Sequence, residues 1–272
     1  MSERVIKQEI SKWEQNLAKY QINDIEKMYD QWIEKSLGYL QPSTKSKLSH
    51  GIDDILFHTH AYLQGSVTQK EAREKIINTA KIFDPTISEI NDLKGLSIDQ
   101  LTYIAQQHIA TSKLQSMVQG GLTGAGGRLF IGIDLPLMII LNLRIVQLIG
   151  LTFGHEINSP YEMMLSLKVF YAATVPKRFQ YEAWMDLKVE LDEAGFYLYE
   201  GNEKLTDRTV MYQATKQVLK NLMIVMGRKK LIQGVPIVSI GIGVVSNHQL
   251  TRQVANFALK FNQLRKIEGL GC

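Results

Sequence analysis

Residues Gly120 to Gly127 read Gly-Gly-Leu-Thr-Gly-Ala-Gly-Gly, and an apolar run comes directly after them. Each glycine inside a helix costs roughly 1 kcal/mol relative to alanine. Five glycines in eight residues therefore predict that this segment is not ordinary helix. The segment needs either backbone freedom or the very close approach of another backbone. We expect one turn of helix and then a sharp glycine bend into the next helix.

The spacing of these glycines favours contact between helices over a nucleotide site. Gly120 and Gly124 are four residues apart, as are Gly121 and Ala125, and small residues at this spacing let two helix backbones touch. A phosphate-binding loop lacks support, because residues 98–118 read as helix and the usual lysine and acidic partner are missing. Exposed amides at the start of the next helix can still attract an anion such as a lipid phosphate.

Asp134-Leu135-Pro136 places a carboxylate beside a proline in the apolar run. Pro136 is expected to start or kink a helix, and Asp134 is able to cap that helix. Arg144 lies nearly three helical turns later and can share a face with Asp134. We expect a buried ionic or capping role here. No second carboxylate in this segment offers a partner for acid–base catalysis.

The composition is that of a folded globular chain with a small basic excess. The 272 residues are 45% hydrophobic and 21% charged, and the formal net charge is +4. This excess permits attraction to anionic surfaces but does not indicate nucleic acid as a partner. The single cysteine, Cys272, forms no intrachain disulfide, which fits a reducing compartment. We therefore expect a cytoplasmic protein, and the oligomeric state stays open.

Two apolar runs are too short or too polar to cross a bilayer. The run from Leu129 to Leu143 contains Asp134, and the run from Leu231 to Val245 is interrupted by Gly234 and Pro236. A spanning helix needs about 20 mostly apolar residues. The charged N-terminal twenty residues also lack the apolar core of an export signal. We expect both runs to be core helices of a single 1–272 domain.

Helical periodicity dominates the chain and predicts an all-α, multi-helix fold. An amphipathic N-terminal segment (1–40) places Ile6, Ile10 and Trp13 on one face, which is expected to dock on the protein itself. Caps are expected at Ser97 and Ser159, the latter with a proline and a glutamate after it. Asn247 is expected to cap a last helix that runs through Ala255, Ala258, Phe261 and Leu264. Only 196–199 suggests an extended strand.

No catalytic or metal-binding set emerges from the sequence. On a helix, His58 and His60 point in directions about 200° apart, so they cannot share one ion, and the zinc-protease His-x-x-x-His pattern is missing. His155 comes after a predicted helix end, where a positive charge suits the helix dipole. We predict no catalytic residues, no metal and no cofactor.

The same residues resemble the signature of the EcsC protein family. The likeness rests on the glycine segment, Asp134-Leu135-Pro136, Leu143-Arg144-Ile145 and Phe153-Gly154. It extends to Ile10 to Glu14 near the N-terminus and to Val235-Pro236 with Gly241, Gly243 and Asn247 downstream. Ser239 and Ile240 depart from the small-residue spacing of the family's C-terminal part. The likeness covers most of the chain, with a glycine-rich half (97–175) and C-terminal apolar and basic helices (205–272).

The resemblance implies a helical, cytoplasmic protein but no reaction. The family takes its name from the third gene of a bacterial operon encoding an ABC transporter, and no enzymatic activity is established for it. We expect an accessory or adaptor protein that meets the inner membrane surface or a membrane transporter. The alternative is an enzyme or binding protein for a phosphate- or lipid-bearing ligand near Gly124 to Asp134. Its ligand-binding or structural residues would be Gly121, Gly124, Gly126, Gly127, Asp134, Pro136, Arg144, Gly241, Gly243 and Asn247.

Overall fold

The computed structural model describes residues 3–22, 24, 27, 67–125, 131–199 and 239–269. All regular secondary structure in these ranges is helical, which confirms the all-α prediction. The helices are α1 (Glu3–Ala18), α4 (Val67–Ala80), the 3-10 helix η1 (Ile90–Gly95), α5 (Ile98–Ala125), α6 (Ile131–Thr152), α7 (Pro160–Thr174), α8 (Lys177–Tyr199) and α10 (Ser239–Glu268).

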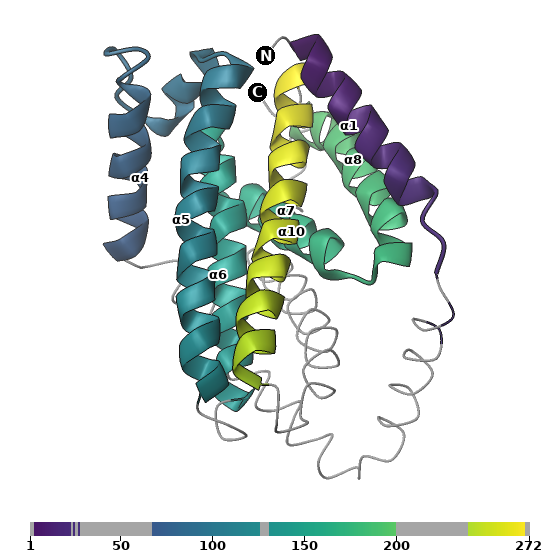
Figure 1. Cartoon of the computed structure of the whole chain (residues 1–272). Helices are drawn as coiled ribbons and strands as arrows, with labels where there is room; N and C mark the ends of the chain where they lie inside the picture. Colours follow the sequence, from purple (N-terminus) through teal and green to yellow (C-terminus); the bar gives the residue numbers. More distant parts are fainter. Residues whose placement is uncertain are drawn as a thin grey trace.

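Three long helices, α5, α6 and α10, lie side by side and form the centre of the fold (Figure 1). α4 covers one side of this group, and α1 and α8 lie on the other side (Figure 1). α10 packs most extensively against α5 and also contacts α1, α6 and α7. α10 therefore holds together segments that are far apart in the sequence.

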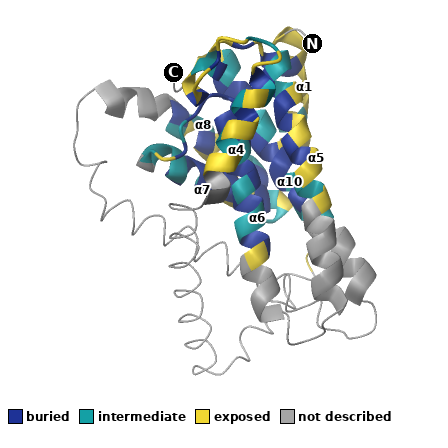
Figure 2. Ribbon diagram, turned by 90° about the vertical axis from the view of Figure 1, so that its left-hand side faces the viewer, coloured by how far each residue is buried: buried dark blue, intermediate teal, exposed yellow. Residues whose placement is uncertain are grey.

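The helical spacing of apolar residues explains this burial. The predicted face of the last helix is confirmed, because Ala255, Ala258, Phe261 and Leu264 are all buried. In α5 the residues Ile98, Leu101, Ala105 and His108 are buried at the same spacing. Figure 2 shows exposed residues along the outer surface of α4, with buried residues behind it in the central helices.

Both predicted N-caps are confirmed. The Gln100 side chain accepts from the Ser97 backbone N–H at 2.9 Å, and Ser97 Oγ accepts from the Gln100 N–H at 3.4 Å. Ser159 caps α7 by accepting the backbone N–H of Glu162 at 3.2 Å, with proline in the first turn. These contacts lie within three residues of each cap, so local sequence determines them.

Gly154 ends α6 in a left-handed conformation with φ of 85°. The Gly154 N–H donates to the carbonyl of Leu151 at 3.0 Å, and the His155 N–H donates to that of Gly150 at 3.1 Å. These two bonds are those of a Schellman motif. A Cβ at position 154 would lie 2.5 Å from Lys94 Cγ, so η1 packs directly on this backbone. Glycine is needed here for both its conformation and its size.

α1 docks on the body of the protein, as predicted. Ile6 and Ile10 are buried, and Trp13 packs edge-on against Trp184 of α8 and Phe257 of α10, with ring centroids 4.8 and 5.2 Å away. α1 ends at Ala18. Most of the remaining predicted 1–40 segment lies outside the described residues.

The prediction that the glycine segment is not ordinary helix is wrong for its first part. α5 continues through Gly120, Gly121 and Gly124 and ends at Ala125. The cost of glycine in a helix is offset where the helix packs closely on a neighbour, and α5 packs extensively along α10. The expected bend into the next helix falls at residues 126–130, which lie outside the described residues.

Three other local predictions are also wrong. Asn247 does not cap the last helix, because α10 begins eight residues earlier, at Ser239. Asp134 does not cap a helix and Pro136 does not start one, because α6 already begins at Ile131. Residues 196–199 belong to α8 and not to a strand. In each case, the helix extends beyond its local sequence signal.

Candidate functional site

The register between α5 and α10 determines which residues meet at each level of the fold. The two helices are antiparallel (Figure 1), and Gln263 Nε2 of α10 donates to Thr102 Oγ1 of α5 at 3.0 Å. A second observation agrees with this register. Burial, and then the nearby guanidinium of Arg252 in α10, lower the pKa of Lys113 in α5. Lys113 and Arg252 are each eleven residues from the Thr102–Gln263 pair.

This register brings the two glycine segments to the same level. Counting 22 residues along α5 from Thr102 reaches Gly124, and counting 22 back along α10 from Gln263 reaches Gly241. Gly243 lies two residues further along α10, level with the turn of α5 that contains Gly121. Glycines at one level of two packed helices can let the helix axes come closer than the usual 8–10 Å if they face each other. Sequence reasoning identifies both segments but does not place them opposite each other.

α6 adds a third apolar helix end at the same place. Its first turns come shortly after the end of α5, so the end of α5 and the starts of α6 and α10 lie together (Figure 1). We call this region the hairpin end: residues 114–125, 131–141 and 239–246. Two large apolar side chains near it are exposed to solvent, Leu114 at 63% and Leu137 at 39%. The hairpin end is our candidate functional site.

The other predicted site residues are only partly placed by the structure. Gly126 and Gly127 lie outside the described residues, and the side chains of Asp134, Pro136 and Asn247 are not described. Arg144 is half-buried on α6 and has an interaction partner. Its predicted pairing with Asp134, and a phosphate- or lipid-bearing ligand near Gly124 to Asp134, therefore stay predictions.

A separate, polar cluster lies where α7 starts beside the C-terminal part of α10. It is not identified from the sequence alone. Arg265 is only 2% exposed, and its two terminal nitrogens donate to the two carboxylate oxygens of Glu162 at 2.9 and 2.7 Å. Glu162 is 13% exposed. This is a bidentate, charge-assisted contact, the strongest geometry available to an arginine and a carboxylate. It joins residues 103 positions apart in sequence.

His155 and Tyr161 complete this cluster. Nδ1 of His155 lies 3.9 Å from Glu162 Oε1, which is too long for a hydrogen bond. Burial, followed by the charges of Arg265, Lys94 and Lys266, lowers the pKa of His155 well below its usual value. His155 is therefore neutral, and its predicted charge at the helix end is wrong. Burial also raises the pKa of the Tyr161 phenol to about 12.

This geometry favours a structural role for the cluster. Both oxygens of Glu162 are occupied by one guanidinium, and the neutral imidazole of His155 is out of hydrogen-bonding range. Within this cluster, Tyr161 Oη and Arg265 Nε are buried without a hydrogen-bond partner. One local pattern does point to the cluster. Arg265 lies four residues after Phe261, so a cation occurs on an otherwise apolar helix face.

The described ranges contain neither a metal centre nor a membrane-spanning helix. No group of three or more histidine, cysteine or carboxylate side chains there is arranged to hold a metal ion. Within the same part of the chain, every helix is too short or too polar to traverse a bilayer.

The protein is therefore an all-α protein built around three long helices. The end of α5 and the starts of α6 and α10, which contain glycines and apolar residues, lie together. Residues 4–267 match the EcsC protein family, and the chain belongs to that family. It is similar to "Uncharacterized protein YdbA" of Bacillus subtilis (strain 168), with 19% identity over 268 residues. The alignment covers 95% of this chain and 90% of that protein. No solved structure matches.

Proposed function

We propose that this protein is a non-enzymatic, cytoplasmic adaptor that attaches peripherally to the inner face of the membrane through its hairpin end. One observation carries the proposal. The end of α5 and the starts of α6 and α10 lie together at one end of the protein, and Leu137 is exposed there on α6. A shallowly inserted apolar surface needs no spanning helix, because interfacial segments enter the bilayer by only about 5–10 Å.

The distance of each exposed leucine from the end of its helix can be compared with the depth to which such segments enter a bilayer. Leu137 lies six residues from the start of α6, which corresponds to about 9 Å at 1.5 Å per residue. Leu114 lies eleven residues before the end of α5, about 16 Å from it. Leu137 is therefore within reach of the acyl boundary, and Leu114 is beyond it. Ile82 is 77% exposed just after the end of α4, near the opposite end of α5.

The test is co-sedimentation of the full chain with vesicles of phosphatidylcholine, with and without added phosphatidylglycerol. Burial of one leucine side chain contributes about 2 kcal/mol, so Leu137→Glu should weaken partitioning at least about tenfold. Leu114→Glu should have a smaller effect, and Ile82→Glu is the matched control and should bind like the wild type. Thermal melts must show that all three variants fold.

Two results would overturn lipid attachment. One is a wild-type chain that does not bind either vesicle. The other is equal loss of binding in the Ile82 and Leu137 variants, which would mean that the hairpin end is not the contact. A membrane transporter as the docking partner belongs to the same proposal. It is tested by co-purification of the wild type and the Leu137 variant from solubilised membranes.

A further inference from the structure

Two carboxylates of α1 lie close to cations of neighbouring helices. The buried face of α1 carries Ile6 and Ile10, and Glu14 on the flank accepts Trp184 Nε1 at 2.6 Å and Lys188 Nζ at 2.9 Å. Glu9 is close enough to Lys260 of α10 to interact with its charge. Two of the carboxylates of α1 are therefore directed toward cations of the protein itself.

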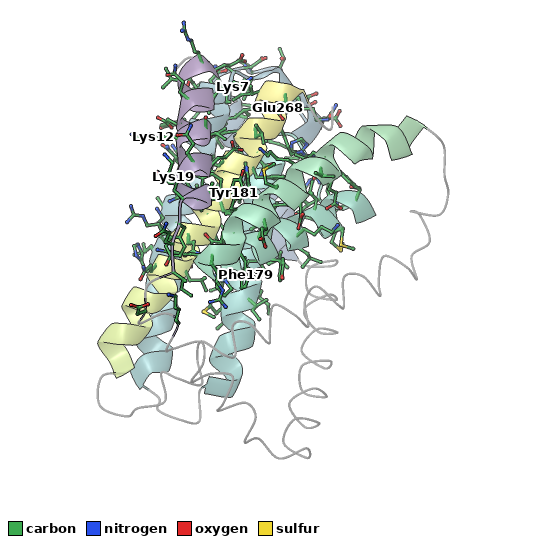
Figure 3. The ribbon with its side chains drawn as sticks, turned by 90° about the vertical axis from the view of Figure 1, so that its right-hand side faces the viewer. Lys7, Lys12, Lys19, Phe179, Tyr181 and Glu268 are labelled. Atoms are coloured by element: carbon green, nitrogen blue, oxygen red, sulfur yellow. The ribbon has the colours of Figure 1, made fainter. Side chains whose placement is uncertain are left out.

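Cations also lie on the outer side of α1. Lys12 within the helix and Lys19 just after its end are exposed along its outer edge, whereas Lys7 lies on the other side of the ribbon, near Glu268 (Figure 3). Lys12 and Lys19 are seven residues apart, two helical turns, so they share one face. Arg4 is exposed on the same outer half of the helix. None of these four cations pairs with a carboxylate of the described residues.

The start of α8 adds a cation next to the end of α1. Lys177 Nζ lies 5.6 Å from the ring centroid of Tyr20, which joins the beginning of α8 to the chain just after α1. Phe179 is 43% exposed, and the Arg178 guanidinium lies 4.5 Å from its ring centroid. We call Arg4, Lys12, Lys19 and Lys177 the cationic face.

We propose that the cationic face is the partner-binding surface of the protein and that it takes an acidic segment of another protein. The cations from Arg4 to Lys19 span about 22 Å, which matches four turns of a helix with carboxylates on one side. Opposite charge across such a surface selects the partner and speeds association.

The chemistry of α1 argues against a membrane as the occupant of this face. An interfacial helix inserts its apolar side into the bilayer. The apolar side of α1 is already buried in the protein, and Gln8, Ser11 and Gln15 lie exposed between the outer cations. The inference rests on the proposed adaptor role, because it supplies the second contact that an adaptor needs. The hairpin end and the cationic face are separate surfaces, so an experiment can reject one proposal without rejecting the other.

The experiment is fluorescence anisotropy of the full chain with a labelled helical peptide, about five turns long, that has glutamate along one side. The same peptide with glutamine in place of glutamate is the ligand control. Lys12→Glu with Lys19→Glu should weaken binding at least about tenfold at low salt, and binding should fall steeply with added salt. The matched control is Lys70→Glu with Lys81→Glu, which changes net charge equally on the α4 side and should stay within about twofold of the wild type.

Several outcomes would overturn the proposal. They are equal loss in both double variants, equal binding of the glutamine peptide, or tighter binding of single-stranded DNA or anionic vesicles at this face. The Lys12 and Lys19 variant should still sediment with vesicles, and the Leu137→Glu variant should still bind the peptide. Loss of vesicle binding with intact peptide binding would therefore reject only the membrane attachment, and the reverse result would reject only the cationic face.

Discussion

Replacing Gly154 with alanine should lower the free energy of unfolding by about 3 kcal/mol, for two separate reasons. The residue has φ of 85°, and an alanine in the left-handed region costs about 1–2 kcal/mol. The new Cβ would also lie 2.5 Å from Lys94 Cγ and 3.1 Å from the Lys94 backbone nitrogen. Relieving this overlap means moving η1 away from α6, which costs about 1–3 kcal/mol more.

Two other glycines separate these causes. Gly269 also has a positive φ, 65°, but a Cβ there meets nothing within 4 Å. Gly269→Ala should therefore cost only the backbone part, about 1 kcal/mol. Gly150 lies inside α6, and a Cβ there would be 3.8 Å from Ile157, an ordinary contact. Gly150→Ala should be neutral or stabilising by up to about 1 kcal/mol, because alanine is the better helix former.

Urea unfolding of the three purified variants, monitored by far-UV circular dichroism, measures these differences. In thermal unfolding, a loss of about 3 kcal/mol should lower the Tm by roughly 6–12 °C for a domain of this size. The reasoning is refuted if Gly154→Ala and Gly269→Ala cost the same, because the contact with η1 would then contribute nothing. It is also refuted if Gly154→Ala is as stable as the wild type.

The core supplies three more tests. Arg265→Met should cost about 3–5 kcal/mol, because it leaves the Glu162 carboxylate buried without its partner; adding Glu162→Gln should recover part of this in urea unfolding. Stability should fall as the pH drops from about 6.5 toward 4, by at most about 3 kcal/mol from His108, because burial lowers its folded pKa to about 4 and only the unfolded chain then binds the proton. His108→Phe should make this fall smaller, and the pH dependence that remains should come from His155, whose pKa is also lowered. Cysteines at Gly124 and Gly241 should form a disulfide on mild oxidation, as shown by faster migration in a non-reducing gel.

Each of these predictions has a contradicting result. If Glu162→Gln adds its own full cost to that of Arg265→Met, the two side chains do not act as a pair. An unchanged pH profile in His108→Phe would remove His108 as the titrating group. The disulfide test uses a Cys272→Ser background. A cysteine at position 248, seven residues and about 10 Å along α10 from Gly241, should not cross-link to position 124.

The parts of the fold that can be predicted from sequence depend on short-range contacts. The Ser97 and Ser159 caps involve residues at most three positions apart, and the buried stripe of α10 repeats at helical spacing. Local capping signals place the start of α10 wrongly at Asn247, because packing against α5 extends the helix beyond them.

The core cluster depends on contacts that no local pattern contains. Arg265 meets Glu162 across 103 positions, and the neutral state of His155 results from burial that only the folded chain creates. Each glycine segment is recognisable on its own, but their alignment needs the Thr102–Gln263 register. The family itself is recognisable from local motifs, and its match extends over residues 4–267.

The central position of α10 has a consequence for biosynthesis. Helices α1, α5, α6 and α7 leave the ribosome before the segment that fills the space between them. Until residues 254–264 emerge, apolar side chains such as Trp13 and Trp184 have no Phe257 to cover them. Such long-range closure makes folding slow and exposes aggregation-prone surfaces. The nascent chain should therefore depend on chaperones until α10 has left the ribosome.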